Sequence, residues 1–164
     1  MDTTKAYILL GSDMGERIRT IEAARKRIEE ECGRITKYSS LYESEPWGFK
    51  SETMFVNQVI VIETALTPFE LLDRTMQIEK SLGRKRNGVS NGYSSRTIDI
   101  DILFFGKEQI STERLTVPHP RITQRRFTLV PLAEISPHFI HPTEHKTTAK
   151  LLKECPDKSA VEKI

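Results

Sequence analysis

The order of two hydrophobic periods along the chain constrains its fold more than any other sequence feature. Residues 54–64 divide into two faces with a period of two, as in a strand, whereas 17–32 has apolar residues every three or four positions, as in an amphipathic helix. Strands are expected at 5–10, 34–43, 54–64 and 97–105, and helices at 17–32 and from Thr67 to about Leu82. This β-α-β-β-α-β order predicts an α+β plait, with helices against a mainly antiparallel sheet.

The ends of these elements carry recognisable signals. Thr67 can cap the second helix, Pro68 suits its first position, and Glu70 completes a capping box. In the first helix we expect a buried stripe of Ile18, Ile21, Ala24 and Ile28. Further elements are expected as short strands in 108–117, a short helix within 121–134 and a last helix near 147–155. Segments 44–53 and 83–96 are expected to be loops, and 11–15 a structural turn.

Length and composition narrow the class of protein. With 164 residues, 37% hydrophobic and 29% charged, the chain is the size of one soluble domain, taken as 1–164. A formal net charge of +2 gives no reason to expect a nucleic acid or an anionic membrane as partner. Cys32 and Cys155 fit a reducing compartment. Residues 1–20 do not resemble a signal peptide, and no run approaches the roughly 20 apolar residues of a membrane helix. We therefore expect a cytoplasmic monomer or small oligomer.

Two aspartates in the strand expected at 97–105 are the first candidates for chemistry. Because side chains alternate across a strand, Asp99 and Asp101 point to one face, and the isoleucines around them point to the core. Carboxylates roughly 7 Å apart at their Cα atoms can share hard cations. Taken alone, the pattern is more often the solvated face of a half-buried strand. The adjacent basic segment 83–96 favours a metal–polyphosphate site, because arginines can hold the phosphate oxygens that a metal leaves uncovered.

Phosphate would have to be held by side chains, because the chain has neither a P-loop nor a dinucleotide-binding glycine pattern. Each basic residue taken singly is more often a solvated surface charge. His119, between two prolines, could likewise be a surface histidine, or could donate a hydrogen bond to a phosphate oxygen. The candidates are Arg84, Arg86, Arg96, Arg114, His119, Arg121, Arg125 and Arg126.

A flat slot for a planar heterocycle is a third candidate feature. Trp47 lies in a Pro/Gly segment, Phe55 and Asn57 share a strand face, and Phe127 follows the arginine cluster. Without other context, Phe55 and Phe127 would be plain core residues. The amide of Asn57 on an otherwise apolar face favours the slot, because a buried amide must find partners and could bond the edge of a ring.

Seven segments together resemble one family. They are LGSDMG (10–15), SSLYESEPWG (39–48), FVNQV (55–59), IEKSLGR (78–84), SRTIDIDILFFG (95–106), LTVPHPR (115–121) and RRFTLVPLAEISP (125–137). In this order they resemble the 6-hydroxymethyl-7,8-dihydropterin pyrophosphokinases of folate biosynthesis, over nearly the whole chain. The resemblance implies a monomeric, ferredoxin-like plait that transfers a diphosphate from ATP to the pterin hydroxymethyl group and releases AMP.

The same resemblance implies roles for individual residues. Asp99 and Asp101 would hold two Mg²⁺ ions, and Arg84 and Arg96 would act on the polyphosphate. The ATP-binding residues would be Glu79, Arg86, Arg96, Ile102, Arg114, Thr116, His119 and Arg125. The pterin-binding residues would be Ser44, Trp47, Gly48, Phe55, Asn57 and Phe127. The chain departs from the family pattern between Arg84 and Arg96, where the segment is longer and a second arginine is missing. A lid over ATP is expected there.

Two other functions remain compatible with the sequence. An RNA-binding plait would fit the fold, the basic segment and the aromatic residues, although the aromatic RNP pattern is absent and two aspartates would repel a phosphate backbone. A nucleotide-sensing module would bind ATP without producing AMP.

Overall fold

The computed structural model describes residues 2–13, 16–45, 54–83 and 98–164. Its centre is an antiparallel sheet with strand order β5-β1-β4-β3-β8, in which β2 also pairs with β4. The strands of this sheet are β1 (Thr4–Ser12), β2 (Arg34–Tyr38), β3 (Tyr42–Ser44), β4 (Phe55–Thr64), β5 (Asp99–Phe105) and β8 (Val161–Lys163). A second, small sheet pairs β6 (Ile110–Ser111) with β7 (Thr116–Val117).

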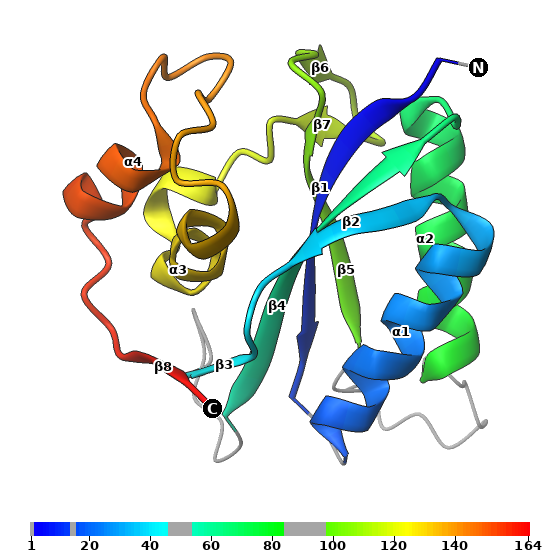
Figure 1. Cartoon of the computed structure of the whole chain (residues 1–164), viewed down its shortest axis with the longest axis horizontal. Coiled ribbons are helices and arrows are strands. Elements are labelled where there is room, and N and C mark those ends of the chain that lie inside the picture. The colour runs from blue at the N-terminus through cyan, green and yellow to red at the C-terminus, as the bar shows by residue number, and fades with distance from the viewer. Residues whose placement is uncertain (1, 14–15, 46–53, 84–97) are drawn as a thin grey trace.

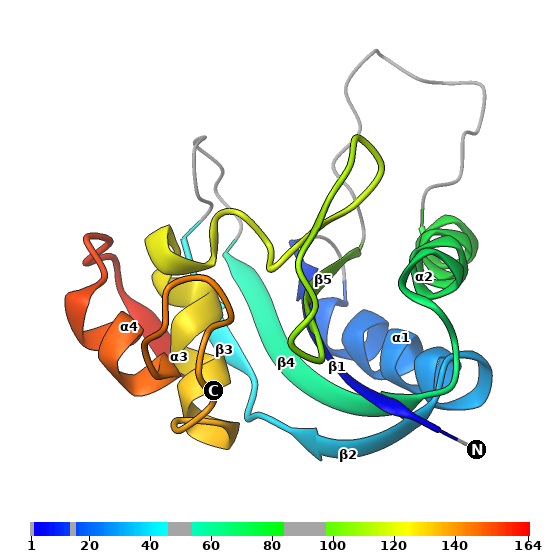
Figure 2. The same ribbon diagram turned by 90° about the horizontal axis from the view of Figure 1, so that it is seen from above.

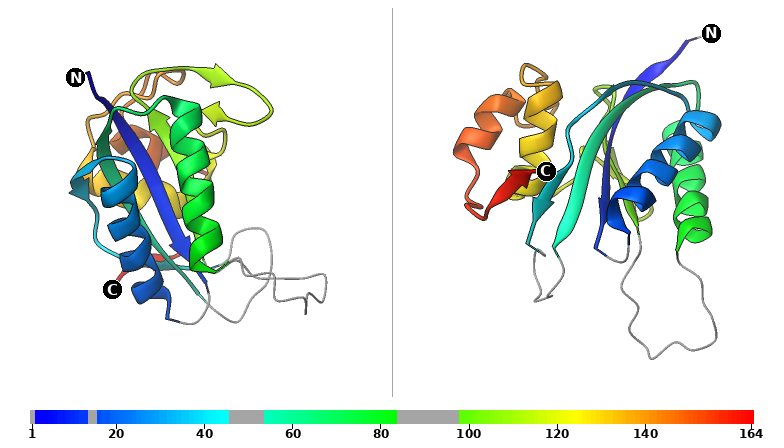
Figure 3. Two further views of the ribbon diagram at one scale, coloured as in Figure 1. Left: turned by 90° about the vertical axis from the view of Figure 1, so that its right-hand side faces the viewer. Right: turned by 60° about the horizontal axis from the view of Figure 1, so that its bottom comes forward.

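Helices cover both faces of the sheet, so the molecule has three layers (Figures 1 and 2). α1 (Arg17–Glu31) and α2 (Pro68–Leu82) lie side by side on one face, as Figure 3 shows. α3 (Arg126–Ile135) and α4 (Thr148–Glu154) cover the other face, and a 3-10 turn, η1 (Ile122–Gln124), precedes α3. The element order and strand order confirm the predicted α+β fold, a ferredoxin-like plait with a mainly antiparallel sheet flanked by helices.

Each face of the sheet carries its own hydrophobic core. Val56, Ile60 and Ile62 of β4 pack in the cluster that includes α1 and α2. Val59 and Val61 of the same strand pack in the cluster that includes α3 and α4. The predicted division of 54–64 into two faces is therefore confirmed, and both faces are covered because helices pack on each side.

The helix signals are largely confirmed. The Thr67 side chain accepts a hydrogen bond from Glu70 N at 3.2 Å, and the Glu70 carboxylate accepts one from Thr67 N at 2.8 Å, which completes the capping box of α2. α1 buries Ile21, Ala24 and Ile28. The prediction for Ile18 is wrong, since it is 43% exposed. At about 100° per residue, Ile18 lies roughly 90° from the mean direction of the three buried side chains.

Three other expectations need correction. The strand expected at 34–43 is two strands, β2 and β3, separated near Ser39, whose backbone N donates to Val59 O at 2.8 Å and whose hydroxyl accepts from Val59 N at 3.0 Å. Gly11 and Ser12 belong to β1 and not to a turn. The terminal strand β8 was not expected, because three residues are too few to show a period. None of the helices in the described ranges combines the length and hydropathy needed to cross a bilayer.

Candidate active site

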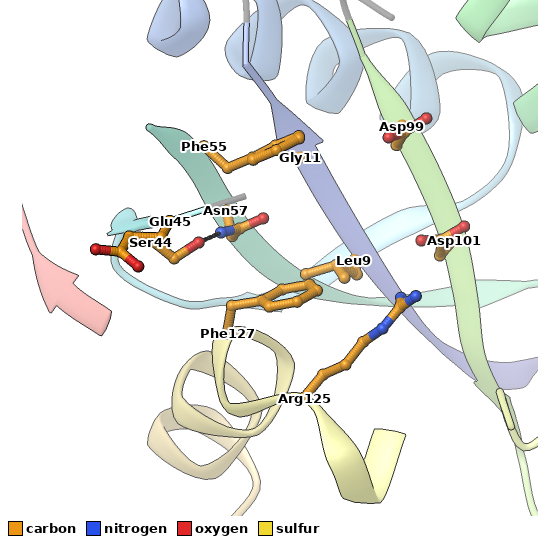
Figure 4. Close-up of a pocket in the computed structure, with 10 residues that line it drawn as sticks. All are labelled: Leu9, Gly11, Ser44, Glu45, Phe55, Asn57, Asp99, Asp101, Arg125 and Phe127. Carbon is orange, nitrogen blue, oxygen red and sulfur yellow. Dashed lines mark hydrogen bonds between the residues drawn. The ribbon is translucent and has the colours of Figure 1, made fainter. Parts of the chain in front are cut away.

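A cavity of about 180 Å³ opens on the sheet face that carries α3. Its floor is formed by β1, β4 and β5, and one of its walls by the beginning of α3 (Figure 4). The lining residues are Leu9, Gly11, Ser44, Glu45, Phe55, Asn57, Asp99, Asp101, Arg125 and Phe127. The fold thus brings candidates for metal, phosphate and ring binding into a single site.

The two aspartates lie on the cavity side of β5, as the alternation predicts (Figure 4). The isoleucines on the opposite side of the strand are at most 6% exposed and belong to the core under α1 and α2. β5 lies at the edge of the sheet, and α2 holds it there through Glu79, whose Oε2 accepts a hydrogen bond from Ile100 N at 2.8 Å. Glu79, a predicted ATP residue, therefore anchors the strand backbone between Asp99 and Asp101.

Arg125 extends from the beginning of α3 toward Asp101 (Figure 4). Burial lowers the pKa of its guanidinium, and the charges of Asp101 and Asp99 oppose that change. An arginine remains charged under these conditions, so Arg125 supplies a fixed cation opposite the carboxylates. Its guanidinium carbon also lies 5.4 Å from the centre of the Phe127 ring. A third carboxylate, Asp13, is close enough to interact with Asp99: burial first, and Asp99 to a smaller extent, raise the pKa of Asp13.

The predicted ring slot lies on the other side of the cavity. The rings of Phe55 and Phe127 are on either side of Asn57 in Figure 4. Asn57 is only 2% exposed, and its Nδ2 donates a hydrogen bond to Ser44 Oγ at 2.8 Å. This bond fixes the orientation of the amide and leaves its other hydrogen-bonding capacity for a ligand edge. Ser44 thus acts by orienting Asn57, a contact that the sequence did not reveal.

Gly11 joins the two halves of the site. It pairs with Asp99 of β5 on one side and with Asn57 of β4 on the other. Adjacent strands are about 4.8 Å apart, so roughly 10 Å of floor separates the backbones of the amide and the carboxylate residues. A Cβ at Gly11 would lie 3.0 Å from Asn57 Oδ1. The absence of a side chain therefore keeps this floor flat and leaves the amide accessible.

Three other predicted ATP residues, Arg114, Thr116 and His119, lie between β5 and α3 and outside the cavity lining. His119 N donates to Leu103 O at 2.9 Å, and His119 Nδ1 accepts from Arg121 N at 3.2 Å. Burial, together with the charges of Arg125 and Arg121, lowers the pKa of His119 to about 4. The ring is therefore neutral near pH 7, and because Nδ1 accepts a hydrogen bond, Nε2 carries the proton and can donate it in a hydrogen bond.

Arg114 and Thr116 lie around the small sheet. Arg114 forms an ion pair with Asp73 of α2, and its guanidinium carbon lies 5.6 Å from the centre of the Phe69 ring. Thr116 is in β7 and its hydroxyl lies 3.4 Å from Thr112 O. In this arrangement Arg114 is held against α2, and a contact with a nucleotide would require it to leave Asp73.

Not every predicted residue can be placed in the site. The Ile102 side chain is 4% exposed and belongs to the core, so only its backbone could contact a nucleoside. The predicted roles of five residues stay predictions, because these residues lie outside the described ranges: Arg84, Arg86, Arg96, Trp47 and Gly48. The expected lid over ATP lies outside them too.

Three lining residues were missed by the sequence reasoning, namely Leu9, Gly11 and Glu45. A glycine within a strand often marks a close approach of a ligand or of another backbone, and this signal could have identified Gly11. The glycines and polar residues of 11–15 favour a turn instead, and this competing signal hides it. For Leu9 and Glu45, no local signal distinguishes a lining residue from an ordinary strand residue.

The donor set suits a hard divalent cation that also binds substrate. Within the described residues, no group of three or more His, Cys, Asp and Glu side chains could hold a metal. The site offers two carboxylates on one strand face. Mg²⁺ is commonly bound by one or two carboxylates, with water and substrate phosphates completing its coordination. Asp99 and Asp101 therefore fit a magnesium ion that arrives with a nucleotide, rather than a cation enclosed by protein ligands alone.

Comparison with known proteins agrees with this geometry. A family model described as 7,8-dihydro-6-hydroxymethylpterin-pyrophosphokinase (HPPK) matches residues 7–137. A Bacillus subtilis protein named 2-amino-4-hydroxy-6-hydroxymethyldihydropteridine pyrophosphokinase is 46% identical over 131 residues, which are 79% of this chain and 77% of that protein. An Aquifex aeolicus protein of the same name is 43% identical over 140 residues, 85% of each chain.

Longer proteins contain a similar region. The Pneumocystis carinii folic acid synthesis protein fol1 is 38% identical over 96% of this chain, which corresponds to 21% of its own length. A crystal structure of wild-type Plasmodium falciparum HPPK-DHPS with pteroate aligns with a TM-score of 0.76 at 17% identity, over 93% of this chain and 44% of that one. This structural similarity concerns the fold. The chain belongs to the 7,8-dihydro-6-hydroxymethylpterin-pyrophosphokinase family.

Proposed function

We propose that this chain transfers the diphosphate of ATP to the hydroxymethyl group of 6-hydroxymethyl-7,8-dihydropterin, with release of AMP, in folate biosynthesis. One observation supports this most directly. A single cavity has a buried amide between two aromatic rings on one side, and two carboxylates with an arginine on the other. The first half suits a planar polar ring, and the second half suits a metal-bound polyphosphate.

The pterin would lie on the bare floor at Gly11. Phe55 and Phe127 would pack against its two faces, since aromatic rings bury large planar area with favourable offset geometry. Asn57, oriented by Ser44, would bond the polar edge of the ring. In this orientation the hydroxymethyl group would face Asp99 and Asp101 across the cavity. The proposed pterin site also includes Trp47 and Gly48, on the evidence of the family resemblance.

The polyphosphate would lie between the carboxylates and the basic residues. Arg125, charged and facing Asp101, would hold phosphate oxygens with charge-assisted hydrogen bonds. His119, neutral with its proton on Nε2, could donate one more without adding a charge. Arg84, Arg86, Arg96, Arg114 and Thr116 are assigned to ATP by resemblance, with Glu79 and the Ile102 backbone near the nucleoside. Asp99 and Asp101 would bind two Mg²⁺ ions, which supply charge neutralisation on phosphate and orientation of the attacking hydroxyl.

The bond changes follow from the products. The pterin hydroxyl oxygen attacks the β-phosphorus of ATP, the bond from that phosphorus to the oxygen bridging the α- and β-phosphates breaks, and this oxygen leaves with AMP. The hydroxyl proton is released. Such a transfer asks the protein for positioning and charge neutralisation and requires no covalent intermediate on the protein. The chain would act as one domain spanning 1–164, as a monomer.

The decisive experiment mixes the protein with Mg-ATP and the reduced hydroxymethyl-pterin and measures AMP and pterin diphosphate. We expect the two products in equal amounts, and neither without Mg²⁺. ATP binding without AMP would identify a nucleotide-sensing module, and ADP in place of AMP would indicate transfer of a single phosphate. Retention of RNA on filters with comparable affinity would favour the RNA-binding plait, which the two carboxylates in the cavity argue against.

A further inference from the structure

The C-terminal segment after α4 contacts both sides of the ring slot, although it lines neither. It runs from Asp157 to Lys163 and ends in β8 beside β3, as Figure 1 and the right panel of Figure 3 show. Its contacts fall on two elements that are far apart in sequence. One is the beginning of α3, which carries Phe127 and follows Arg125; the other is β3, which carries Ser44.

Asp157 binds the beginning of α3. Its Oδ2 accepts a hydrogen bond from Arg126 N at 3.0 Å, and its Oδ1 accepts from Ser159 N at 2.9 Å and Ser159 Oγ at 2.6 Å. The guanidinium of Arg126 donates in turn to Ser159 O at 3.3 Å. The helix has no side-chain cap of its own at Arg125. A carboxylate at this end satisfies an amide left unpaired by the helix and interacts favourably with the helix dipole.

This contact falls between two residues of the site. Arg125 and Phe127, which flank Arg126, both line the cavity. Asp157 therefore holds the backbone from which the phosphate-facing arginine and one ring of the slot both project.

The other end of the segment supports the opposite wall. Val161 of β8 pairs with Ser44 of β3. Directly after the segment, Ile164 N donates to Leu41 O at 3.0 Å. Ser44 is the residue whose hydroxyl accepts the hydrogen bond from Asn57. Movement of β8 would therefore be transmitted through β3 to the amide that faces the ring.

A cluster around Glu134 connects α3, β3 and β8 directly. Its carboxylate accepts hydrogen bonds from Ser40 N at 2.8 Å, Ser40 Oγ at 2.7 Å and Tyr42 OH at 3.0 Å. Lys163 Nζ of β8 lies 3.9 Å from Glu134 Oε2. The C-terminal segment therefore contacts α3 near both of its ends, through Asp157 at the beginning and through Lys163 near Glu134.

We propose that segment 157–163 is a strap that sets the separation of the two ring-slot walls, and that Asp157 is a positioning residue for pterin binding. The inference rests on the proposed function, because it takes the slot to be the pterin site. The strap acts on both walls of the ring slot, at Phe127 and at Asn57. Of the residues assigned to ATP it adjoins only Arg125, through the backbone of Arg126, whereas Arg114, Thr116 and His119 lie on other segments. Its loss should therefore weaken pterin binding much more than Mg-ATP binding.

The test measures dissociation constants without turnover. Calorimetry on the full chain would titrate the reduced hydroxymethyl-pterin, with and without a non-hydrolysable ATP analogue, and separately Mg-ATP. For Asp157→Ala we expect roughly tenfold weaker pterin binding, as loss of a charged hydrogen-bond acceptor implies. Mg-ATP binding should change less than about threefold. Asp157→Asn keeps one acceptor oxygen and should recover part of the loss.

A matched control removes a carboxylate that has no contact with the slot. Glu154 of α4 pairs with Lys146 at 2.8 Å, so Glu154→Ala should leave both dissociation constants unchanged. The strap proposal would be overturned if Asp157→Ala weakened the binding of pterin and Mg-ATP equally, or weakened neither. If Asp157→Ala does not fold, Ser159→Ala decides, because it removes only the hydroxyl bond to Asp157 and should give a smaller loss confined to the pterin. If Ser159→Ala causes no loss of pterin affinity, the proposal is refuted. A wild-type protein that binds no pterin overturns the proposed function and, with it, this inference.

Discussion

Gly11→Ala tests whether the floor of the slot must be bare. The added Cβ would lie 3.0 Å from Asn57 Oδ1, tighter than an ordinary contact by a few tenths of an ångström. The backbone of Gly11 is held by β4 and β5 on both sides, so the amide must move. We expect the folded protein to be retained, since overpacking by one methyl typically costs about 1–3 kcal/mol.

The effect on the ligand can be estimated from the contacts that the amide would lose. Displacing Asn57 gives up its bond to Ser44 in the free and the bound protein alike, so that loss lowers stability and not affinity. The affinity falls because the ring edge is left poorly paired, at about 1–3 kcal/mol. This cost of about 1–3 kcal/mol corresponds to roughly 5- to 150-fold weaker pterin binding. Mg-ATP binding should change by less than about threefold, because Gly11 contributes no side chain to the carboxylates.

A double-mutant cycle makes this reasoning refutable. Calorimetric pterin affinities would be compared for Gly11→Ala, Asn57→Ala and the double variant, each checked for folding by thermal melting. If Gly11→Ala acts through the amide, its effect should largely disappear in the Asn57→Ala background. Additive effects would show that the methyl blocks the ring directly. Unchanged pterin affinity in Gly11→Ala would refute the placement of the ring on this floor.

Three other predictions follow from the same structure. Asp99→Asn and Asp101→Asn should each abolish Mg-dependent AMP formation, and normal turnover in either variant would contradict the metal assignment. Each should also raise the melting temperature of the metal-free protein slightly, because a like-charge repulsion is removed. The pKa of His119 is lowered from 6.5 to about 4, so between these pH values the unfolded chain binds more protons than the folded protein. The free energy of unfolding of the wild type should therefore fall as pH decreases through this window, by up to about 1.4 kcal/mol per pH unit. In urea titrations at several pH values, His119→Gln should lose this part of the slope. Thr67→Ala should lower the free energy of unfolding by about 1 kcal/mol without changing AMP formation; a loss of activity at unchanged stability would speak against a purely structural cap.

Much of the fold could be predicted because its signals are local. The period of two in 54–64 and the capping box at Thr67 depend only on neighbouring residues, and both are confirmed. The alternation that places Asp99 and Asp101 on one face, away from the isoleucines of the core, is equally local and equally confirmed. The errors occur where local signals are weak or shared, as with Ile18 at the edge of a helical stripe and with the three residues of β8.

The sequence by itself determined the order of the long strands and helices, the sheet faces and which residue types could bind a metal, a phosphate and a ring. Only the tertiary structure decided that these candidates meet. Gly11 lies between Asp99 and Asn57 because β1 pairs with both β5 and β4, a register that depends on contacts between residues dozens of positions apart. The contact of Asp157 with the beginning of α3 likewise joins residues that are distant in the sequence. Local periodicity carries no information about such pairings, because they are selected by the packing of the whole chain around its two cores.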